Sequence, residues 1–315
     1  PVQPMQHQYL ITEPIEGITS DLPTLRDPDR LCYFKEEVGG LVMGGYELNP
    51  LVWTPKNGIP RDFHFQLLES DWDQFEDLFV QAAGRVPALE NVGIRQLING
   101  PEAFTPDGNF ILGEAPEVKG YFVGAGFNAY GIAANGGAGK ALAEWIVGGE
   151  PSMDLWPIDI SRFGDHHRDT KFLIDRTTEA TSKHYTMAWP SEEHESGRPL
   201  KTSPLYEQLK TAGACFGSKF GWERPNWFAP KDIEPKDLPS YGRPNWFKYV
   251  AQEHRHTREA VSLFDESSFA KYRVEGSDAE KALSWICANN INIEPGRLVY
   301  TQLCNKHGGI EADLT

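Results

Sequence analysis

Short apolar runs separated by turn residues fill the beginning of the chain. Strand-forming residues occupy 7–12, 31–35 and 41–46, and the pair Gly39-Gly40 precedes the last run. β-Branched and aromatic residues in runs of this length are typical of strands, and paired glycines favour a tight turn. The pattern predicts an antiparallel sheet between residues 7 and 46.

A helical pattern follows the predicted sheet. Ser70 and Asp71 are residue types that cap helices, and apolar side chains then recur at helical spacing: Trp72, Phe75, Leu78, Phe79 and Ala82. Pro87 ends the pattern, because its ring does not fit inside a helix. Residues 94–99 indicate another strand, and the prolines and glycines of 100–108 predict a loop.

A strand, a glycine turn and a helix are predicted next. Residues 121–125 form a short apolar run, 126–131 a tight connection and 133–147 a helical stretch ended by Gly148 and Gly149. The first amides of a helix have no partner within it and present positive charge. Such a helix start can stabilise negative charge, for example on the edge of a reduced flavin ring.

Glycines within this unit leave two interpretations open. Five glycines would let a flavin ring approach the backbone and let the helix lie close to its sheet: Gly126, Gly131, Gly136, Gly137 and Gly139. Glycine turns before helices are also common as simple packing devices. The pattern alone favours the two interpretations about equally.

The second half of the chain is less regular. Residues 151–230 carry several prolines and few long periodic runs, which favours a meandering connector domain. The similar segments 224–228 and 243–247 flank a polar stretch and mark a candidate domain boundary. Alternating elements after it indicate the start of an α+β domain: a helical stretch from Glu253, a strand at 270–274, a helix at 277–288 and a strand at 298–303.

Composition narrows the classes of function. A net charge of −15 repels a phosphate backbone, so we expect no nucleic-acid partner. No apolar run approaches the roughly twenty residues of a membrane span. The cysteines are far apart and form no CxxC pair, so we expect buried thiols in a reducing compartment rather than zinc ligands or disulfides: Cys32, Cys215, Cys287 and Cys304.

Both ends of the chain have the features of internal positions. Pro1 is no initiator methionine, and no basic or apolar leader pattern follows it. Residues 310–315 follow a Gly-Gly turn and have the pattern of a strand that has just begun. We therefore expect a piece of a longer protein.

Several segments in collinear order resemble the sarcosine and dimethylglycine dehydrogenases. Residues 124–131, with 136–140 and 143–146, are similar to the C-terminal flavin-binding signature of that family. Further similar segments lie on both sides of it, at 5–9, 12–13, 44–47, 100–107, 159–163, 221–225 and 308–315. The resemblance covers nearly the whole chain, and 44–50 look more like the sarcosine branch.

The resemblance implies an α+β fold that is a fragment of an α/β flavoprotein. It implies a substrate-binding sheet domain (1–115), a returning strand-helix element of the FAD domain (116–150), a central connector domain (151–230) and the incomplete start of an aminomethyltransferase-like domain that binds tetrahydrofolate (231–315). The dinucleotide-binding half with its GxGxxG turn would precede Pro1. This piece alone is then expected to bind flavin weakly and to be inactive.

The chemistry implied by the resemblance is oxidative N-demethylation of sarcosine or dimethylglycine. A hydride passes from the N-methyl carbon to FAD, and the one-carbon unit goes to tetrahydrofolate or leaves as formaldehyde. The electron acceptor would be an electron-transfer flavoprotein or oxygen. The location would be the mitochondrial matrix in a eukaryote or the cytoplasm in a bacterium.

The resemblance also implies site residues. It places Tyr9 at the tyrosine that faces flavin and substrate, although β-propensity alone favours a structural strand tyrosine. His7 shares a strand face with Tyr9 and would either hydrogen-bond the site or serve the structure. The expected flavin contacts, mainly through the backbone, are Gly126, Asn128, Ala129, Tyr130, Gly131 and Ile132.

Other polar residues are left unassigned by the sequence. A substrate carboxylate requires a bidentate cation, and Arg26, Arg30 and Arg95 cannot be ranked for that role. The pairs His166-His167 and His254-x-His256 lack further ligands, so we expect solvated side chains and no metal site.

Two other functions remain open. The first is a noncatalytic regulatory subunit of pyruvate dehydrogenase phosphatase, which has the same architecture. The pair Gln8-Tyr9 argues mildly against it. The second is an aminomethyltransferase-like folate binder, of which too little is present to bind folate alone.

Overall fold

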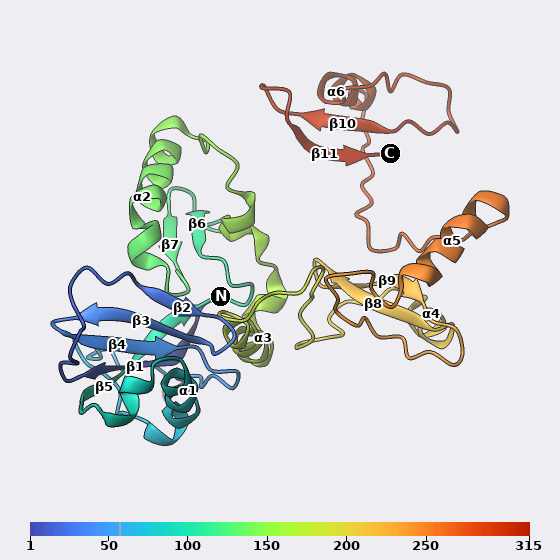
Figure 1. Cartoon of the computed structure of the whole chain (residues 1–315). Coiled ribbons are helices and arrows are strands. Elements are labelled where there is room, and N and C mark those ends of the chain that lie inside the picture. Colours follow the sequence, from blue (N-terminus) through green and yellow to red (C-terminus); the bar gives the residue numbers. More distant parts are fainter. Residues whose placement is uncertain (57) are drawn as a thin grey trace. The chain divides into compact units, whose positions relative to one another are not determined.

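The computed structural model describes residues 1–56 and 58–315 (Figure 1). The chain forms two compact units, Pro1–Leu263 and Phe264–Thr315. The first holds a five-stranded sheet, a strand-helix element and a connector, and the second holds one helix and two strands.

The predicted antiparallel sheet is present and is larger than the pattern indicated. Its strands follow the order β2-β3-β4-β1-β5, with bounds Leu25–Asp27, Cys32–Glu37, Gly40–Gly45, Gln3–Thr12 and Ile94–Phe104. All pairings within it are antiparallel. The long strand β1 lies between β4 and β5, and Tyr9 pairs with Gly44 on one side and Ile98 on the other.

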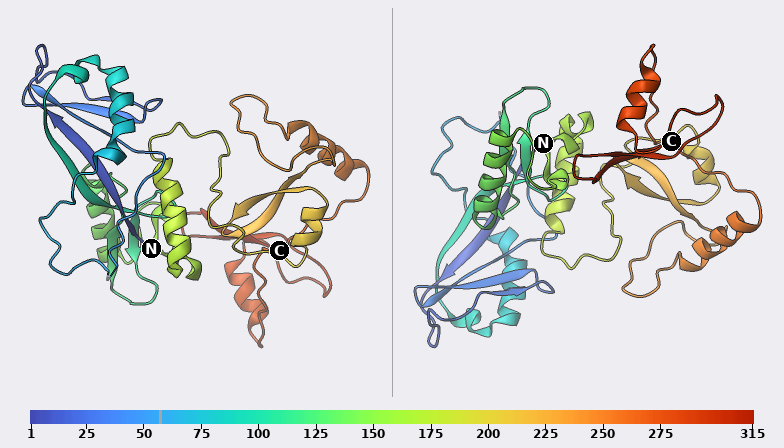
Figure 2. Two further views of the ribbon diagram at one scale, coloured as in Figure 1. Left: turned by 90° about the horizontal axis from the view of Figure 1, so that it is seen from below. Right: turned by 90° about the horizontal axis from the view of Figure 1, so that it is seen from above.

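One face of this sheet is closed by α1 (Trp72–Arg85), the predicted helix (Figure 2). Asp71 caps it, because the Asp71 carboxylate accepts a hydrogen bond from the Gln74 amide at 3.0 Å. Phe75 and Leu78 of the helix pack with Leu10 of β1, and all three are buried. A 3₁₀ turn, η1 (Pro87–Asn91), follows. The alternation along β1 therefore sends Met5, His7 and Tyr9 to the opposite face.

The predicted strand, turn and helix are confirmed. The hairpin of β6 (Ile111–Glu114) and β7 (Phe122–Ala125) leads into α2 (Gly131–Gly148), which ends at Gly149 in the left-handed conformation. Helix and hairpin meet at Gly113, where an added Cβ would lie 3.0 Å from the Trp145 ring. Glycine is needed there both for this contact and for its φ of +124°.

The connector contains more regular structure than its sequence indicated. Three 3₁₀ turns, η2 (Trp156–Ile158), η3 (Ile160–Arg162) and η4 (Asp165–Arg168), precede α3 (Thr170–Ser182). The elements α4 (Tyr206–Thr211), β8 (Ala214–Lys219), β9 (Trp222–Phe228) and α5 (Phe247–Glu259) follow. Trp227 is buried and stacks on Tyr249, and its indole nitrogen donates to Asp237 at 2.5 Å.

The second unit contains α6 (Ala279–Ile286), β10 (Thr301–Cys304) and β11 (Ile310–Leu314). The two strands pair antiparallel. The strand expected at 270–274 is absent from this described segment, which has no regular structure.

The loop expected at 100–108 was wrong in its first half, because β5 continues to Phe104. Pro101 lies within it, opposite Gln6. The physical reason is position: β5 is the last strand of the sheet, where the missing N–H of proline can face away from the ladder.

Gly45 gives the first testable prediction. A Cβ at this position would overlap the Leu31 carbonyl oxygen and the Leu78 side chain. Gly45→Ala should therefore lower the free energy of unfolding by about 2 kcal/mol or more in a urea titration. In the control Gly84→Ala, the new methyl meets only Arg30 Nε at 3.7 Å inside a helix. That change should be neutral or stabilise by up to ~1 kcal/mol, and equal effects of the two variants would contradict the packing argument.

Candidate functional site

The face of the sheet opposite α1 carries a buried histidine next to a tyrosine hydroxyl. His7 is 8% exposed, and its Nε2 lies 3.3 Å from the Tyr33 hydroxyl. Tyr33 of β3 and Tyr9 of β1 both pair with Gly44, one from each side. A Cβ at Gly44 would collide with the Tyr33 hydroxyl and approach Tyr9 Cβ to 2.9 Å. The bare glycine thus allows the two tyrosines to lie against one strand position.

Rings from distant parts of the chain gather beside His7. The Tyr46 ring centroid lies 4.4 Å from that of His7, 4.5 Å from His184 and 4.8 Å from Tyr185. We call the whole group the aromatic cluster, which consists of His7, Tyr33, Tyr46, Phe104, His184 and Tyr185. The last two members directly follow α3, so the connector completes this face of the sheet.

The cluster keeps its histidines uncharged. Burial lowers the pKa of His7 to about 4. The pKa of His184 is also lowered to about 4, first by burial and then by the positive charge of Arg26. His7 Nδ1 is buried and has no hydrogen-bond partner among the described residues. At neutral pH both imidazoles are therefore neutral and can donate or accept a hydrogen bond.

Burial also raises the pKa values of the tyrosines and carboxyls of this face. Burial raises the pKa of Tyr33 and of Tyr46, and nearby Glu102 adds to both shifts. The Tyr46 hydroxyl donates to Glu102 at 3.1 Å, and burial raises the pKa of Glu102. Glu47, which acts on Tyr33 electrostatically, is 8% exposed, and burial raises its pKa to about 7. A buried surface of this kind disfavours charged guests that lack a counter-ion.

One arginine lies at the rim of the cluster. The Arg26 guanidinium stacks over the Tyr185 ring at 4.2 Å and donates to the Tyr185 carbonyl oxygen at 3.4 Å. Arg30 instead pairs with Asp27 at 3.7 Å, and Arg95 is exposed on β5. The structure therefore ranks the three arginines that the sequence left equal, and Arg26 is the one beside the cluster.

A buried side chain holds the turn before α2 in place. Asn128 is buried, and its side chain accepts from the Thr105 amide at 2.9 Å and donates to the Gly126 carbonyl at 2.6 Å. Gly126, Asn128 and Ala129 all have positive φ angles. At Gly126 an added Cβ would lie 2.7 Å from Thr105, so this position also requires glycine. The side chain of Asn128 shapes the turn, and any contact with a bound molecule is left to the backbone beyond it.

The start of α2 is uncapped and faces outward. Tyr130 occupies the N-cap position without a side-chain cap, and no acidic residue lies in the first turn. In the described part of the chain, the amides of Gly131 and Ile132 have no acceptor. This positive helix end is thus available to a negatively polarised group.

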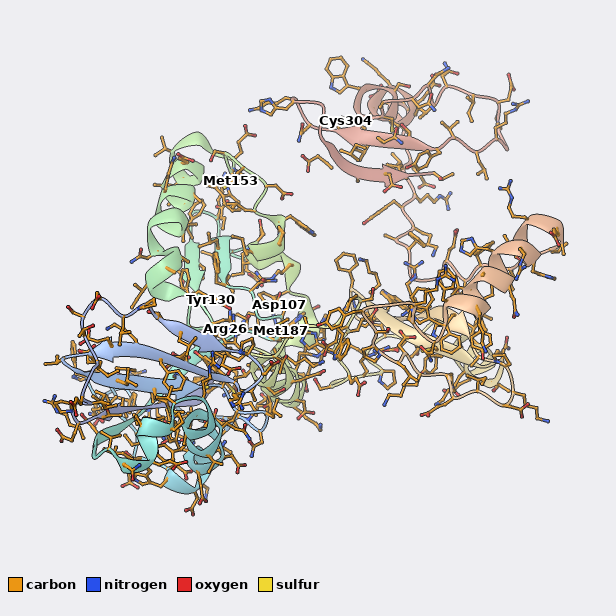
Figure 3. All side chains as sticks on the ribbon, viewed as in Figure 1. Arg26, Asp107, Tyr130, Met153, Met187 and Cys304 are labelled. Atoms are coloured by element: carbon orange, nitrogen blue, oxygen red, sulfur yellow. The ribbon has the colours of Figure 1, made fainter. Side chains whose placement is uncertain are left out.

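The helix start and the aromatic cluster border one region. The Tyr130 ring lies 5.2 Å from His184, which in turn contacts Tyr46. Figure 3 labels Tyr130 and Arg26, which both approach the residues that follow α3.

The glycines within α2 do not serve the contact we expected of them. An added Cβ at Gly136, Gly137 or Gly139 meets nothing within 4 Å among the described residues. These positions point away from the hairpin, and the close approach is made at Gly113 and Gly124 instead. The expectation that they bring α2 close to its sheet was wrong.

The remaining sequence candidates form no metal site. The His166 and His167 rings lie 3.9 Å apart, yet the described residues contain no group of three or more metal-binding side chains. Both rings are partly buried, so the expectation of solvated side chains was wrong for this pair. His254 and His256 lie on α5, where His256 bonds only a backbone oxygen. Cys32 and Cys215 are buried as expected, but Cys287 is only partly buried and Cys304 is exposed, so the expectation of buried thiols was wrong for these two.

Comparisons with known proteins place named families along the chain. Residues 1–145 match the model described as FAD dependent oxidoreductase, and 148–203 match the FAD dependent oxidoreductase central domain. Residues 205–315 match the GCVT N-terminal domain. The fold expected from the sequence, a flavoprotein part followed by an aminomethyltransferase-like part, is confirmed.

Several curated relatives match the whole chain and are enzymes. A 4-methylaminobutanoate oxidase (formaldehyde-forming) from Paenarthrobacter nicotinovorans is 39% identical over 319 residues. Mitochondrial sarcosine dehydrogenase from Mus musculus is 37% identical over 342 residues, and mitochondrial dimethylglycine dehydrogenase from Rattus norvegicus is 33% identical over 324. Each match covers 100% of this chain, which spans 37% to 38% of the length of these relatives.

A relative of a different class matches equally well. The mitochondrial pyruvate dehydrogenase phosphatase regulatory subunit from Mus musculus is 39% identical over 326 residues, covering 100% of this chain and 36% of its own length. Identity alone thus does not separate a catalyst from a regulatory subunit. Within residues 1–56 and 58–315, no helix combines the length and apolarity that a bilayer crossing requires.

The buried carboxyl of Glu47 gives a prediction about pH. Its pKa of about 7 in the folded protein lies above the ordinary 4.5, so the folded state retains a proton that the unfolded state releases. The stabilisation is fully present below pH 4.5 and is lost as the pH rises through about 7. Glu47→Gln should flatten the fall in unfolding free energy over that range by up to about 3 kcal/mol.

Urea unfolding at closely spaced pH values measures this slope. The control is Glu90→Gln, a change at an exposed carboxylate, which should leave the pH profile of the protein unchanged. A Glu47→Gln profile that still falls as steeply as that of the unaltered protein would show that Glu47 is ionised in the folded state.

Proposed function

The chain belongs to the family of sarcosine and dimethylglycine dehydrogenases, and on that premise we propose that the whole protein is an FAD-dependent oxidase or dehydrogenase of N-methyl amino acids. The observation that supports this most directly is the region between the uncapped start of α2 and the aromatic cluster. It combines a positive helix end with a neutral, ring-lined surface beside an arginine.

The residues around α2 fit the pyrimidine edge of an isoalloxazine. When bound, FAD supplies the acceptor for a hydride, and negative charge then collects at that edge. The free amides of Gly131 and Ile132 would stabilise this charge, and no first-turn carboxylate opposes it. Gly126, Asn128, Ala129 and Tyr130 hold the turn that presents those amides.

The aromatic cluster would hold the substrate amine in its neutral form. A hydride leaves a carbon beside nitrogen readily only when the nitrogen lone pair is free to form the iminium. The buried neutral groups around His7 and Tyr33 disfavour an ammonium ion there. The hydroxyl of Tyr33, held by His7, can then orient the amine through a hydrogen bond, with Tyr9 alongside.

The fate of the iminium carbon would depend on the C-terminal part of the chain. The iminium carbon would be released as formaldehyde by water or passed to tetrahydrofolate. Residues 205–315 match the GCVT N-terminal domain, which supports the second route. Electron-transfer flavoprotein and oxygen are the candidate acceptors for the electrons that FAD receives.

The second candidate function is regulatory, because a phosphatase regulatory subunit is as similar to this chain as the enzymes are. A regulatory subunit requires the fold but no amine chemistry. The hydrogen bond between His7 and Tyr33, beside a free helix end, favours catalysis.

Turnover by the full-length protein tests the proposal. Purified protein with bound FAD should reduce an artificial electron-acceptor dye with sarcosine, dimethylglycine or 4-methylaminobutanoate, each tested separately. Tyr33→Phe should keep its flavin but lose turnover by about 10²-fold, because the orienting hydroxyl is gone. The control Tyr206→Phe changes a hydroxyl in α4, away from the cluster, and should keep full activity. Intact flavin with no turnover on any of the three amines would favour the regulatory function.

Arg26 gives a separate prediction about substrate selection. Its guanidinium lies over Tyr185 and has no carboxylate partner among the described residues. It can therefore form a bidentate ion pair with a substrate carboxylate. Arg26→Gln should raise KM for amino-acid substrates by tenfold or more, roughly the strength of a charged hydrogen bond, with a smaller change in kcat. Arg95→Gln serves as the control on the exposed edge strand. An unchanged KM in Arg26→Gln would assign carboxylate binding elsewhere.

A further inference from the structure

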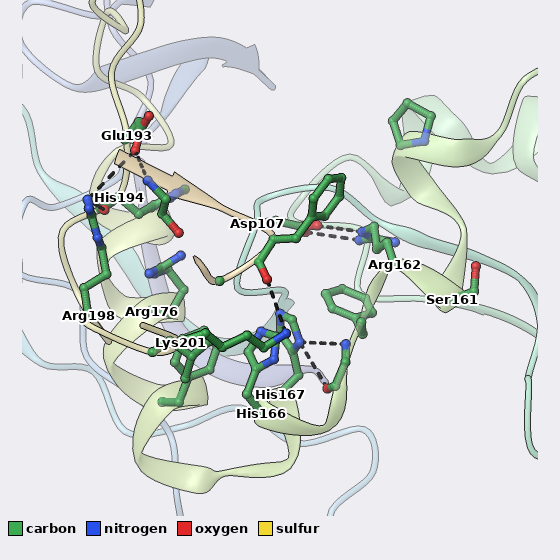
Figure 4. A pocket seen from close by; sticks show the side chains of 18 of the residues that line it. Asp107, Ser161, Arg162, His166, His167, Arg176, Glu193, His194, Arg198 and Lys201 are labelled. Carbon is green, nitrogen blue, oxygen red and sulfur yellow. Dashed lines mark hydrogen bonds and ion pairs between the residues drawn. The ribbon is translucent and has the colours of Figure 1, made fainter. Parts of the chain in front are cut away.

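A cavity lies in the connector and shares no residue with the aromatic cluster. Its volume is about 580 Å³, which is the size of a small-molecule site. Its walls come from the 3₁₀ turns η2 to η4, from α3, from residues 192–201 and from the turn between β8 and β9 (Figure 4).

Four basic side chains line this cavity, and two of them are already neutralised. Arg162 pairs with Asp107 at 2.6 Å. Arg198 donates to Glu223 from Nε at 2.9 Å and from Nη2 at 2.7 Å. These two ion pairs connect the walls of the cavity. They neutralise Arg162 and Arg198, so these two cations contribute little to the binding of an anion.

The other two cations, Arg176 and Lys201, lack a carboxylate partner among the described residues. Arg176 is half-buried and donates from Nε to the Ser196 carbonyl at 3.1 Å and hydroxyl at 3.2 Å. Lys201 Nζ reaches only the Phe220 carbonyl, at 3.4 Å. Figure 4 shows both side chains extending into the cavity. Two positive charges are thus held in one hollow by backbone and hydroxyl oxygens.

The acidic residues of the walls are engaged elsewhere. Glu192 pairs with Lys183 at 3.1 Å, and Glu193 accepts from the Ser218 amide at 2.6 Å. Neither carboxylate approaches Arg176 or Lys201 within 4 Å. Glu179 and Glu223 act on Arg176 only electrostatically, since no described carboxylate lies within 4 Å of it. In a chain of net charge −15, a hollow with two cations outside any ion pair is a local concentration of positive charge.

The rest of the lining suits an anion with an apolar body. His166, His167 and His194 line the cavity, and burial lowers the pKa of all three, so they are neutral donors at pH 7. The rings of Phe172 and Phe220 supply flat apolar walls beside the cations. A guanidinium fork and an ammonium group in one pocket match a carboxylate or a phosphate.

We propose that this cavity is a binding site for a small organic anion, with its carboxylate or phosphate group between Arg176 and Lys201 and its apolar part against Phe172 and Phe220. The site is separate from the amine site and does not depend on the proposed oxidation.

Calorimetric titration of the full-length, flavin-containing protein tests the site. The probes are inorganic phosphate and succinate, which distinguish a phosphate from a carboxylate guest. At least one should bind, and Lys201→Gln should weaken that binding by about tenfold or more, the effect expected for one charged hydrogen bond. Arg176→Gln should do the same, and Arg176→Lys should recover part of the affinity, since it keeps the charge but loses the fork.

Matched controls remove one positive charge outside the cavity. Lys210→Gln in α4 and Arg168→Gln, whose partner is Glu117, should leave the affinity for the probe unchanged. Lys201 is exposed, so its variant keeps the test valid even if Arg176→Gln does not fold. Failure of both probes to bind, or equal binding by Lys201→Gln and its Lys210→Gln control, would overturn the proposal. Loss of FAD from Lys201→Gln would overturn it too, because the cavity would then belong to the cofactor.

Discussion

The position of β1 in the middle of the sheet is the constraint on which the site depends. A strand sends successive side chains to opposite faces, so the packing of Leu10 against α1 fixes His7 and Tyr9 on the other side. A register shift of one residue would bury His7 and Tyr9 under α1 and expose Leu10 on the opposite face. The hydrophobic energy of the α1 face therefore determines the geometry of the opposite face, although no residue of α1 belongs to the aromatic cluster.

Sequence reasoning recovered the parts of the fold whose pattern is local. The sheet, α1 and the strand-turn-helix unit have apolar periodicity and clear turn residues, and all are present. It missed α3, whose buried face includes Thr177 and Thr181 as well as Phe172 and Ala180, so no apolar stripe is visible. It also ended β5 too early, because the edge position that tolerates Pro101 is a property of the assembled sheet. Local sequence patterns fail to predict secondary structure where the position of a residue in the assembled fold determines its conformation.

The candidate site was only partly predictable for the same reason. His7 and Tyr9 share a face by strand period, so their common orientation could be predicted, whereas their roles still rest on resemblance. Tyr33, His184 and Tyr185 are far apart in sequence and carried no motif, so their convergence is visible only in the fold. Gly44 was the available signal for Tyr33, because a glycine in a central strand often marks a close approach of side chains.

The placement of His184 and Tyr185 has a consequence for modularity. These residues lie within 148–203, which matches a different family model from the sheet that they complete. The ring-lined surface is therefore formed by residues from two regions that match different family models. Neither region can be replaced by that of a relative without changing the surface. A chimaera joined near residue 147 would combine rings from two different relatives, and any poor fit would occur where these rings meet rather than in the core of either part.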